Sequence, residues 1–310
     1  PLINNVDDMH EDDLAIMELS SFQLELMTRP PQIAAVLNIT PNHLDRHGTI
    51  GAYTAAKARI LKFQKQADLA ILNREDKGSW NLREELHGDL ISFGYSQPGR
   101  NENGTYIDKG WIMLQIAKER LKLLPLEWIP LRGDHNRLNV LAACAIAAGA
   151  SIALPAIQTA IENFEGIPHR MQLVASKNGV DWYDDSIATT PERALAALKS
   201  FEEPIVLLLG GRDKNLPWEE LLSYASQRVK HFILFGEAAP MIAEKLTKFN
   251  EQQKHLSTTQ AKTLKEAVQL ASEKAEAGDI VLLSPGGTSY DAFVDFEERG
   301  ACFAKWIEEL

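Results

Sequence analysis

Polar residues follow two short apolar runs near the start of the sequence. Glu18 and Ser20 follow the run at 14–17 (LAIM), and His43 follows the run at 33–39 (IAAVLNI). In open parallel sheets, ligands bind beyond the carboxyl ends of the strands. A carboxylate and an imidazole at neighbouring strand ends can bind Mg²⁺, which takes few protein ligands and completes its shell with phosphate and water. The spacing therefore suggests a divalent-cation site.

The same residues also have structural interpretations, which the spacing leaves open. A serine such as Ser20 or Ser21 before a helix is a common N-cap, and His43 can be a surface histidine. Lys57 lies in a helical stretch, where a lone lysine is usually solvated or extends its amine to water along an apolar surface. Spacing alone does not choose between these interpretations.

Two residues in the second half are placed where an anion could bind. Lys214 follows a Gly-Gly turn after an apolar run, where a cation can reach an anionic ligand. Ser289 follows a glycine pair before a predicted helix, an arrangement that can hold a carboxylate. The structural alternatives are a solvated loop lysine and an N-cap serine.

These residues need strands and helices to position them, and the first half predicts a parallel α/β sheet. Continuous apolar runs alternate with helical stretches, a pattern typical of strands covered on both faces. The predicted strands are 14–17, 33–39 and 69–72, the predicted helices are 22–27, 52–63 and 137–148, and a hairpin is predicted at 105–116.

The second half predicts another α/β unit, of Rossmann-like type. An Asn-Gly turn at 177–179 predicts a hairpin, and Thr190-Pro191-Glu192 predicts a helix start, with an N-cap hydroxyl and a proline at the first helical position. Strands are predicted at 205–209, 232–235 and 280–283, and helices at 238–249 and 263–277. A turn-forming tetrad, Glu165-Gly166-Ile167-Pro168, separates domains at 1–166 and 167–310.

Composition limits the classes of partner and the compartment. The 310 residues carry a net charge of -11 without a basic stripe, which argues against nucleic-acid and anionic-membrane partners. The two cysteines, Cys144 and Cys302, form no metal or disulfide pattern, and Cys144 lies in an apolar run that predicts a buried thiol. No stretch approaches the ~18 apolar residues of a membrane span and no signal peptide is present, so a cytoplasmic location is expected.

Several segments occur in an order that resembles one enzyme family. They are ELSSFQLE, LNITPNHLDRH with YTAAKARI, GDHNRLNVLAA, HRMQ, DDSIATTPERAL, LLLGGRDKN and SPGGTSYDAFVDFEERG. Together they resemble the Mur ligase family, in particular its glutamate-adding members, from residue 14 to residue 310. The resemblance implies an α/β fold: a P-loop-type central ATPase domain with a parallel sheet, here truncated, followed by a Rossmann-like α/β C-terminal domain.

The resemblance also implies an activity and a set of site residues. The activity is that of an ADP-forming amide ligase, which joins glutamate to UDP-N-acetylmuramoyl-L-alanine through an acyl phosphate, with ATP and two Mg²⁺ ions. The implied metal ligands and catalytic residues are Glu18, His43 and Lys57, the last as a carbamate. The implied nucleotide-side residues are Asn136, Asn139, Arg170 and Asp185. The implied substrate-side residues are Ser20, Gln23, Thr189, Lys214, Ser289 and Phe296.

Three features depart from the family pattern. No G-x-x-x-x-G-K-[ST] phosphate-binding loop is present, and the chain starts at Pro1, so we expect a fragment with negligible turnover by itself. Ile187 stands where a lysine is usual, which leaves the choice between D- and L-glutamate open. Asn42 stands before His43 where an acid is common, which lowers the negative charge beside the expected metal.

Two alternative functions remain at this stage. One is another ligase of the same broad class, adding L-glutamate or another amino acid, or acting on folylpolyglutamate-type substrates. The other is a non-catalytic relative that binds nucleotide, which the missing loop suggests. In every case we expect a monomer without nucleic-acid or membrane partners.

Overall fold

The computed structural model describes residues 6–40, 44–250 and 256–310. Within these ranges, no helix is both long enough and apolar enough to cross a membrane. The predicted metal ligand His43 lies outside the described residues.

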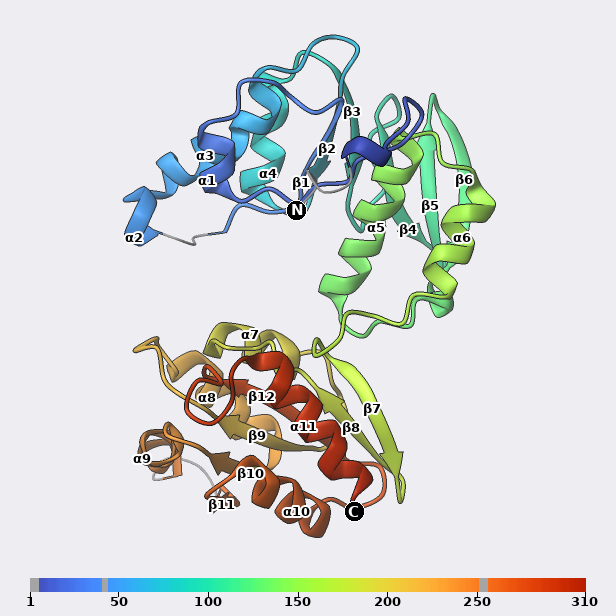
Figure 1. The fold of residues 1–310 in the computed structure, drawn as a ribbon. Helices are drawn as coiled ribbons and strands as arrows, with labels where there is room; N and C mark the ends of the chain where they lie inside the picture. The colour runs from blue at the N-terminus through green and yellow to red at the C-terminus, as the bar shows by residue number, and fades with distance from the viewer. Residues whose placement is uncertain (1–5, 41–43, 251–255) are drawn as a thin grey trace. The chain divides into compact units, whose positions relative to one another are not determined.

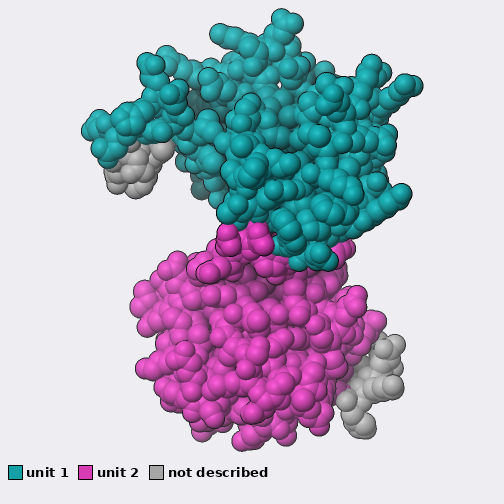
Figure 2. All heavy atoms as spheres, turned by 90° about the vertical axis from the view of Figure 1, so that its right-hand side faces the viewer, with its two compact units in different colours: residues 1–128, 138–161 teal, residues 129–137, 162–310 magenta. Residues whose placement is uncertain are grey.

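The chain divides into two compact units, which Figure 2 shows in different colours. The first is formed by residues 1–128 and 138–161, and the second by residues 129–137 and 162–310. In the described residues each unit contains one six-stranded sheet (Figure 1). The predicted α/β class with two successive, mainly parallel sheets is therefore confirmed.

The first unit is built on a sheet with the strand order β1-β2-β3-β4-β5-β6. Its strands are β1 (Ile33–Val36), β2 (Leu69–Asn73), β3 (Asp89–Phe93), β4 (Asn103–Asp108), β5 (Trp111–Ile116) and β6 (Glu119–Pro125). The helices along this part of the chain are α1 (Ser21–Glu25), α2 (Leu44–His47), α3 (Ile50–Lys62), α4 (Lys77–Asn81), α5 (Asp134–Gly149) and α6 (Leu154–Glu162). Pairing is parallel from β1 to β4 and antiparallel from β4 to β6, so the predicted hairpin is confirmed.

Successive residues of β2 face helices on opposite sides of this sheet. Ala70 and Leu72 are buried in one core with Tyr53 of α3. Ile71 faces the other way, where a Cβ atom added to Gly149 of α5 would lie 3.7 Å from its Cδ1 atom. Because helices cover both faces, β2 is a continuous apolar run and not an alternating one.

The strand predicted at residues 14–17 is wrong. These residues have no regular structure, and Ile16 and Met17 are 89% and 54% exposed. An apolar run becomes a strand only where a neighbouring strand can satisfy its backbone N–H and C=O groups. In the part of the chain that the structure describes, β1 is the edge of the sheet and pairs only with β2.

The second unit has a sheet with the strand order β11-β10-β9-β12-β8-β7, parallel except for the β7–β8 hairpin. Its strands are β7 (Gln172–Lys177), β8 (Val180–Asp184), β9 (Ile205–Gly210), β10 (Val229–Phe235), β11 (Thr258–Gln260) and β12 (Ile280–Gly286). Its helices are α7 (Pro191–Leu198), α8 (Glu219–Arg228), α9 (Ala239–Asn250), α10 (Leu264–Lys274) and α11 (Phe296–Glu308). The order of the strands shows that the chain winds outward through β9, β10 and β11 and then returns to the middle of the sheet.

Two apolar cores lie on the two faces of this second sheet. Leu207 and Leu209 of β9 belong to one core, which includes buried residues of α7, α8 and α9. Val206 and Leu208 belong to the other, which includes buried residues of α10 and α11. The carboxyl ends of β8, β9 and β12 therefore lie side by side at the centre of a sheet that is covered on both faces.

Residues 129–137 precede the predicted domain boundary but pack with the second unit. Arg132 Nη1 lies 2.6 Å from Glu203 Oε1, and its guanidinium carbon lies 5.3 Å from the ring centroids of both Tyr183 and Phe201. The ion pair and the two ring contacts hold this segment against the second sheet. The predicted domain boundary at residue 166 stays a prediction.

Candidate functional site

Ser20 and Gln23 form a capping box at the start of α1. The Ser20 backbone N–H donates to Gln23 Oε1 at 2.8 Å, and the Gln23 backbone N–H donates to Ser20 Oγ at 3.3 Å. This arrangement satisfies backbone donors that a helix start leaves free. Glu18 precedes this cap in an exposed segment without regular structure, so the predicted metal ligand is close in sequence to the predicted substrate pair.

Lys57 of α3 reaches the carboxyl end of β1. Its Nζ atom donates to the Asn38 carbonyl oxygen at 3.0 Å and lies 5.3 Å from the ring centroid of Tyr53. Asn38 is the second residue after β1, at the sheet edge where ligands bind in parallel α/β folds. Among the residues that the structure describes, no group of three or more His, Cys, Asp and Glu side chains is arranged to hold a metal ion. The pairing of Glu18 with His43 stays a prediction, because His43 is not described.

His47 is a site residue that the sequence interpretation missed. Its side chain is only 2% exposed and lies 2.9 Å from Ser21 Oγ through Nε2 and 3.1 Å from Glu25 Oε1 through Nδ1. Its ring stacks on the Phe22 ring, with 5.0 Å between the ring centroids, and lies at an angle to the Tyr53 ring, with 5.3 Å between the centroids. His47 therefore joins both ends of α1 to α3, the helix that carries Lys57.

The hydroxyl–imidazole–carboxylate order around His47 resembles that of a hydrolytic triad. Ser21 is only 6% exposed, however, so a substrate cannot reach its Oγ atom. The cluster therefore has a structural role in positioning α1. The only sequence signal for this cluster is the four-residue spacing of Ser21 and Glu25, which places both side chains on one face of a helix.

In the second unit, the loops after β8, β9 and β12 are connected by hydrogen bonds. Arg212 and Thr288 exchange two backbone bonds of 2.9 Å, and the Gly286 N–H donates to the Ala188 carbonyl oxygen at 2.9 Å. Lys214 Nζ donates to Thr189 Oγ1 at 3.4 Å. The fold thus brings Thr189 and Lys214, which were predicted to share a pocket, to one place.

Ser289 and Phe296 lie in the loop after β12 and at the first residue of α11. Ser289 is buried, and its carbonyl oxygen accepts from Ala292 and Phe293 at 3.1 and 2.9 Å. The predicted helix after Ser289 begins only at Phe296, where Asp295 is the N-cap, so Ser289 is no N-cap. The ring of Phe296 packs edge-on against the His169 ring, with 6.3 Å between the ring centroids.

A buried polar cluster lies beneath these loops. Arg299 of α11 is fully buried, and it donates to Ser186 Oγ at 2.9 Å, to the Ser186 carbonyl oxygen at 2.7 Å and to the Gly287 carbonyl oxygen at 3.1 Å. His169 Nδ1 lies 2.7 Å from Asp184 Oδ2. Burial lowers the pKa of Arg299 to about 10, although the charges of Asp291 and Asp184 oppose this effect.

Asp185 is the most perturbed carboxyl group in this cluster. Burial raises its pKa to about 7, while hydrogen bonds from Ser284 and from the Met171 N–H oppose the rise. Ser284 Oγ donates to Asp185 Oδ2 at 2.7 Å. The charge of exposed Arg170 also lowers this pKa, so the two residues predicted on the nucleotide side are electrostatic neighbours. Strongly perturbed carboxyl groups are common at functional sites.

Asn136 and Asn139 lie one turn apart on α5. Asn136 Nδ2 donates to the Arg132 carbonyl oxygen at 2.7 Å, which joins the first turn of α5 to the residue two positions before the helix. Asn139 is exposed. Their predicted role beside adenine stays a prediction.

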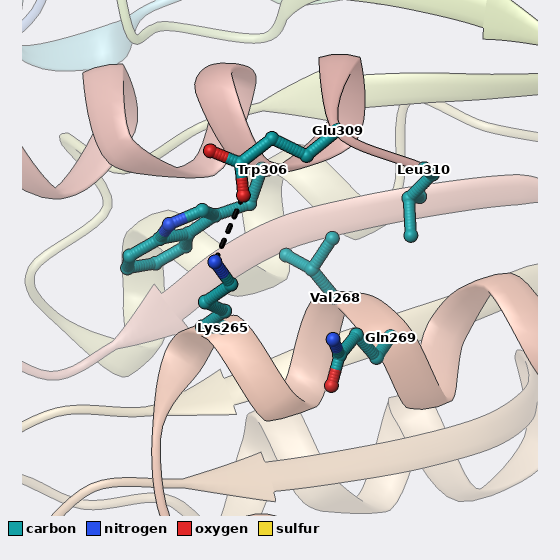
Figure 3. Close-up of a pocket in the computed structure, with 6 residues that line it drawn as sticks. All are labelled: Lys265, Val268, Gln269, Trp306, Glu309 and Leu310. Carbon is teal, nitrogen blue, oxygen red and sulfur yellow. Dashed lines mark hydrogen bonds and ion pairs between the residues drawn. The ribbon is translucent and has the colours of Figure 1, made fainter.

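Two cavities lie in the second unit. One, of about 110 Å³, lies between α10 and α11, where Lys265 and Glu309 form an ion pair of 2.8 Å beside Trp306 (Figure 3). The other, of about 720 Å³, is bordered by residues 129–134 and by Lys199 and Ser200. No predicted site residue lines either of these two cavities.

Comparison with known proteins covers both halves of the chain. Residues 2–147 match the model of the Mur ligase middle domain, and residues 169–287 match that of the Mur ligase, glutamate ligase domain. A UDP-N-acetylmuramoylalanine--D-glutamate ligase of Thermoanaerobacter sp. (strain X514) is 38% identical over 100% of this chain and 68% of its own length. One from Koribacter versatilis (strain Ellin345) is 37% identical over 100% of this chain and 67% of its own length.

Solved structures share the fold at lower identity. UDP-N-acetylmuramate-alanine ligase from Thermotoga maritima matches with a TM-score of 0.62 and 19% identity, over 93% of this chain and 62% of that chain. FolC of E. coli, in complex with DHPP and ADP, also has a TM-score of 0.62 and 19% identity, over 90% of this chain and 61% of that chain. The present chain thus corresponds to about three fifths of each of these solved chains.

Proposed function

Because the chain belongs to the Mur ligase family, we propose that it is the central and C-terminal part of an ADP-forming ligase that adds D-glutamate to UDP-N-acetylmuramoyl-L-alanine. The observation that carries the proposal is the convergence of Thr189 and Lys214 at the carboxyl end of the second sheet. A lysine that forms no ion pair within the described residues and a hydroxyl at that edge are suited to a carboxylate ligand. D-glutamate is preferred to L-glutamate because the similar curated ligases carry that name.

The reaction requires several anions to be held close together. The carboxylate of the muramoyl-alanine substrate is phosphorylated from ATP to an acyl phosphate. The amine of glutamate then forms a bond to the acyl carbon, and phosphate leaves from the tetrahedral intermediate. In the second unit, Lys214 and Thr189 orient the glutamate carboxylates, so that the amine of glutamate faces the acyl carbon. Arg170 and Asp185 lie on the nucleotide side, and this assignment extends to Asn136 and Asn139.

The metal ligands that we propose are Glu18, His43 and Lys57. Glu18 is exposed and has no ion pair within the described ranges, and Lys57 Nζ lies at the carboxyl end of β1. Glu18 and a carbamate of Lys57 would supply the oxygen ligands that Mg²⁺ prefers, and His43 would add one nitrogen ligand. When bound, Mg²⁺ supplies positive charge to the phosphoryl oxygens. We also propose that the protein acts as a monomer in the cytoplasm, where ATP is available.

A ligase assay tests the proposal. We expect the natural full-length protein to release ADP only with ATP, UDP-N-acetylmuramoyl-L-alanine and D-glutamate together. The 310-residue chain by itself should show negligible turnover, because it has no phosphate-binding loop to hold the ATP phosphates. ADP release by the full-length protein that does not depend on glutamate would contradict the proposal.

Substituting Lys57 tests the first half of the site in the same assay. Lys57→Arg keeps the positive charge but cannot form a carbamate, so we expect kcat to fall by about a hundredfold, as when one group that stabilises transition-state charge is lost. The control is Lys62→Arg, which changes an exposed lysine of the same helix. Equal kcat values for the two variants would show that Lys57 holds no metal.

A further inference from the structure

Two cations from different segments of the second unit are held at the same short turn. Lys214 Nζ donates to Thr189 Oγ1 at 3.4 Å, and Arg193 Nη1 donates to the Ile187 carbonyl oxygen at 3.4 Å. The Thr189 N–H donates to the same Ile187 oxygen at 2.8 Å. The lysine comes from the loop after β9 and the arginine from the first turn of α7, so the two are neighbours only in the folded chain.

Neither cation forms an ion pair with a carboxylate of the described chain. Arg212, two residues before Lys214, is different, because its guanidinium contacts Glu237 at 2.7 and 2.9 Å. Burial, and then the positive charge of Arg193, lower the pKa of Lys214. Two like charges held together without a counter-charge repel each other, and a bound anion relieves this repulsion.

Both head groups have donors left for a ligand. A lysine ammonium has three N–H donors and a guanidinium has five, and the two protein bonds at 3.4 Å are long. Both side chains belong to exposed or half-exposed residues. The N-cap of α7, Thr190, makes no side-chain capping bond, so the partial positive charge at that end of the helix is not offset by a side-chain cap.

We propose that Arg193 and Lys214 together bind the side-chain carboxylate of the acceptor amino acid, and that Arg193 thereby sets the preference for glutamate over glutamine. This inference rests on the proposed function. Glutamate and glutamine have nearly the same shape and the same α-carboxylate, and they differ in the charge of the side-chain end. The two cations discriminate between glutamate and glutamine. The neutral amide of glutamine is attracted only weakly to either cation, and it does not offset the repulsion between Arg193 and Lys214.

The test is an NMR titration of the 310-residue chain with D-glutamate and, separately, with D-glutamine. The variants are Arg193→Gln and Lys214→Gln, which remove one charge each. The control is Lys199→Gln, which removes an exposed cation at the other end of α7. We expect each of the first two variants to bind glutamate about tenfold more weakly, as for the loss of one charge-assisted hydrogen bond. Glutamine binding should stay unchanged in Arg193→Gln and in Lys199→Gln.

The outcomes separate this inference from the proposed function. If Lys214→Gln weakens glutamate binding and Arg193→Gln does not, the role of Arg193 is refuted and the proposed function stands. If Arg193→Gln weakens glutamate and glutamine equally, the arginine binds the α-carboxylate or supports the fold, and the inference is wrong. A wild-type chain without preference for glutamate, including one that binds neither amino acid, contradicts the proposed function itself.

Discussion

Replacing Arg299 by methionine is expected to lower the free energy of unfolding of the second unit by about 3–5 kcal/mol, the usual cost of removing one partner from a buried charge cluster. The side chain is fully buried, and its three hydrogen bonds hold Ser186 and Gly287 in place. Methionine has a similar length but no donors, so two carbonyl oxygens and the buried Asp184 would lose a cationic partner. Urea unfolding, with amide hydrogen exchange in β9 and β12, measures the change.

Lys305→Met is the matched control for this substitution. Lys305 is an exposed residue of the same helix, and such surface changes usually stay within about 0.5 kcal/mol. If Arg299→Met and Lys305→Met unfold at the same urea concentration, the buried hydrogen bonds of Arg299 contribute nothing to stability. Because α11 also carries Phe296, we further expect Arg299→Met to loosen the loop after β12.

The second large effect is a pH dependence of stability that arises from Asp185. Its pKa is raised from 3.8 to about 7 in the folded chain, mainly by burial. Between these two values the unfolded chain has lost the proton while the folded chain retains it, so stability falls as the pH rises. Above pH 7 both states are ionised and the loss is complete. At about 1.4 kcal/mol per pKa unit, the roughly three-unit difference corresponds to about 4 kcal/mol.

Asp185→Asn removes this titration while keeping the shape of the side chain. The stability of the variant relative to the wild-type chain should therefore rise by about 4 kcal/mol between pH 4 and pH 8. Urea unfolding of both proteins across this range measures the difference, in which groups common to both largely cancel. Glu202→Gln, at an exposed carboxylate, is the control and should show no such trend. A constant difference for Asp185→Asn would mean that burial does not hold the proton there.

Local backbone preferences explain which elements were predictable. Asn178 and Gly179 have φ angles of 54° and 77°, as an Asn-Gly hairpin turn requires. Pro191 begins α7 as predicted, because its fixed φ angle suits the first helical residue. The expected hydroxyl cap at Thr190 is absent, however. Backbone geometry is set by the residue itself, whereas a side-chain bond competes with other partners.

The prediction at residues 14–17 failed for a related reason. LAIM has the composition of a buried strand, but a strand also needs a neighbour that satisfies its backbone groups, and composition does not reveal whether one exists. The helix predicted after Ser289 begins later than expected, at Phe296, because Asp295 and not Ser289 caps its first turn. In the folded chain Arg299 of that helix is fully buried, since its donors meet Ser186, which lies 113 residues earlier.

By itself, the sequence determined the two-sheet α/β class, the family and the identity of the candidate residues, because residue type, spacing and order are local properties of the chain. Only the tertiary structure decided which of these residues meet. It placed Lys214 beside Thr189 and Arg193 at the same turn. It also placed His47 in contact with Ser21 and Glu25, at the two ends of α1. Such contacts join residues far apart in sequence, and they form only where packed strands and helices bring distant side chains within hydrogen-bonding distance.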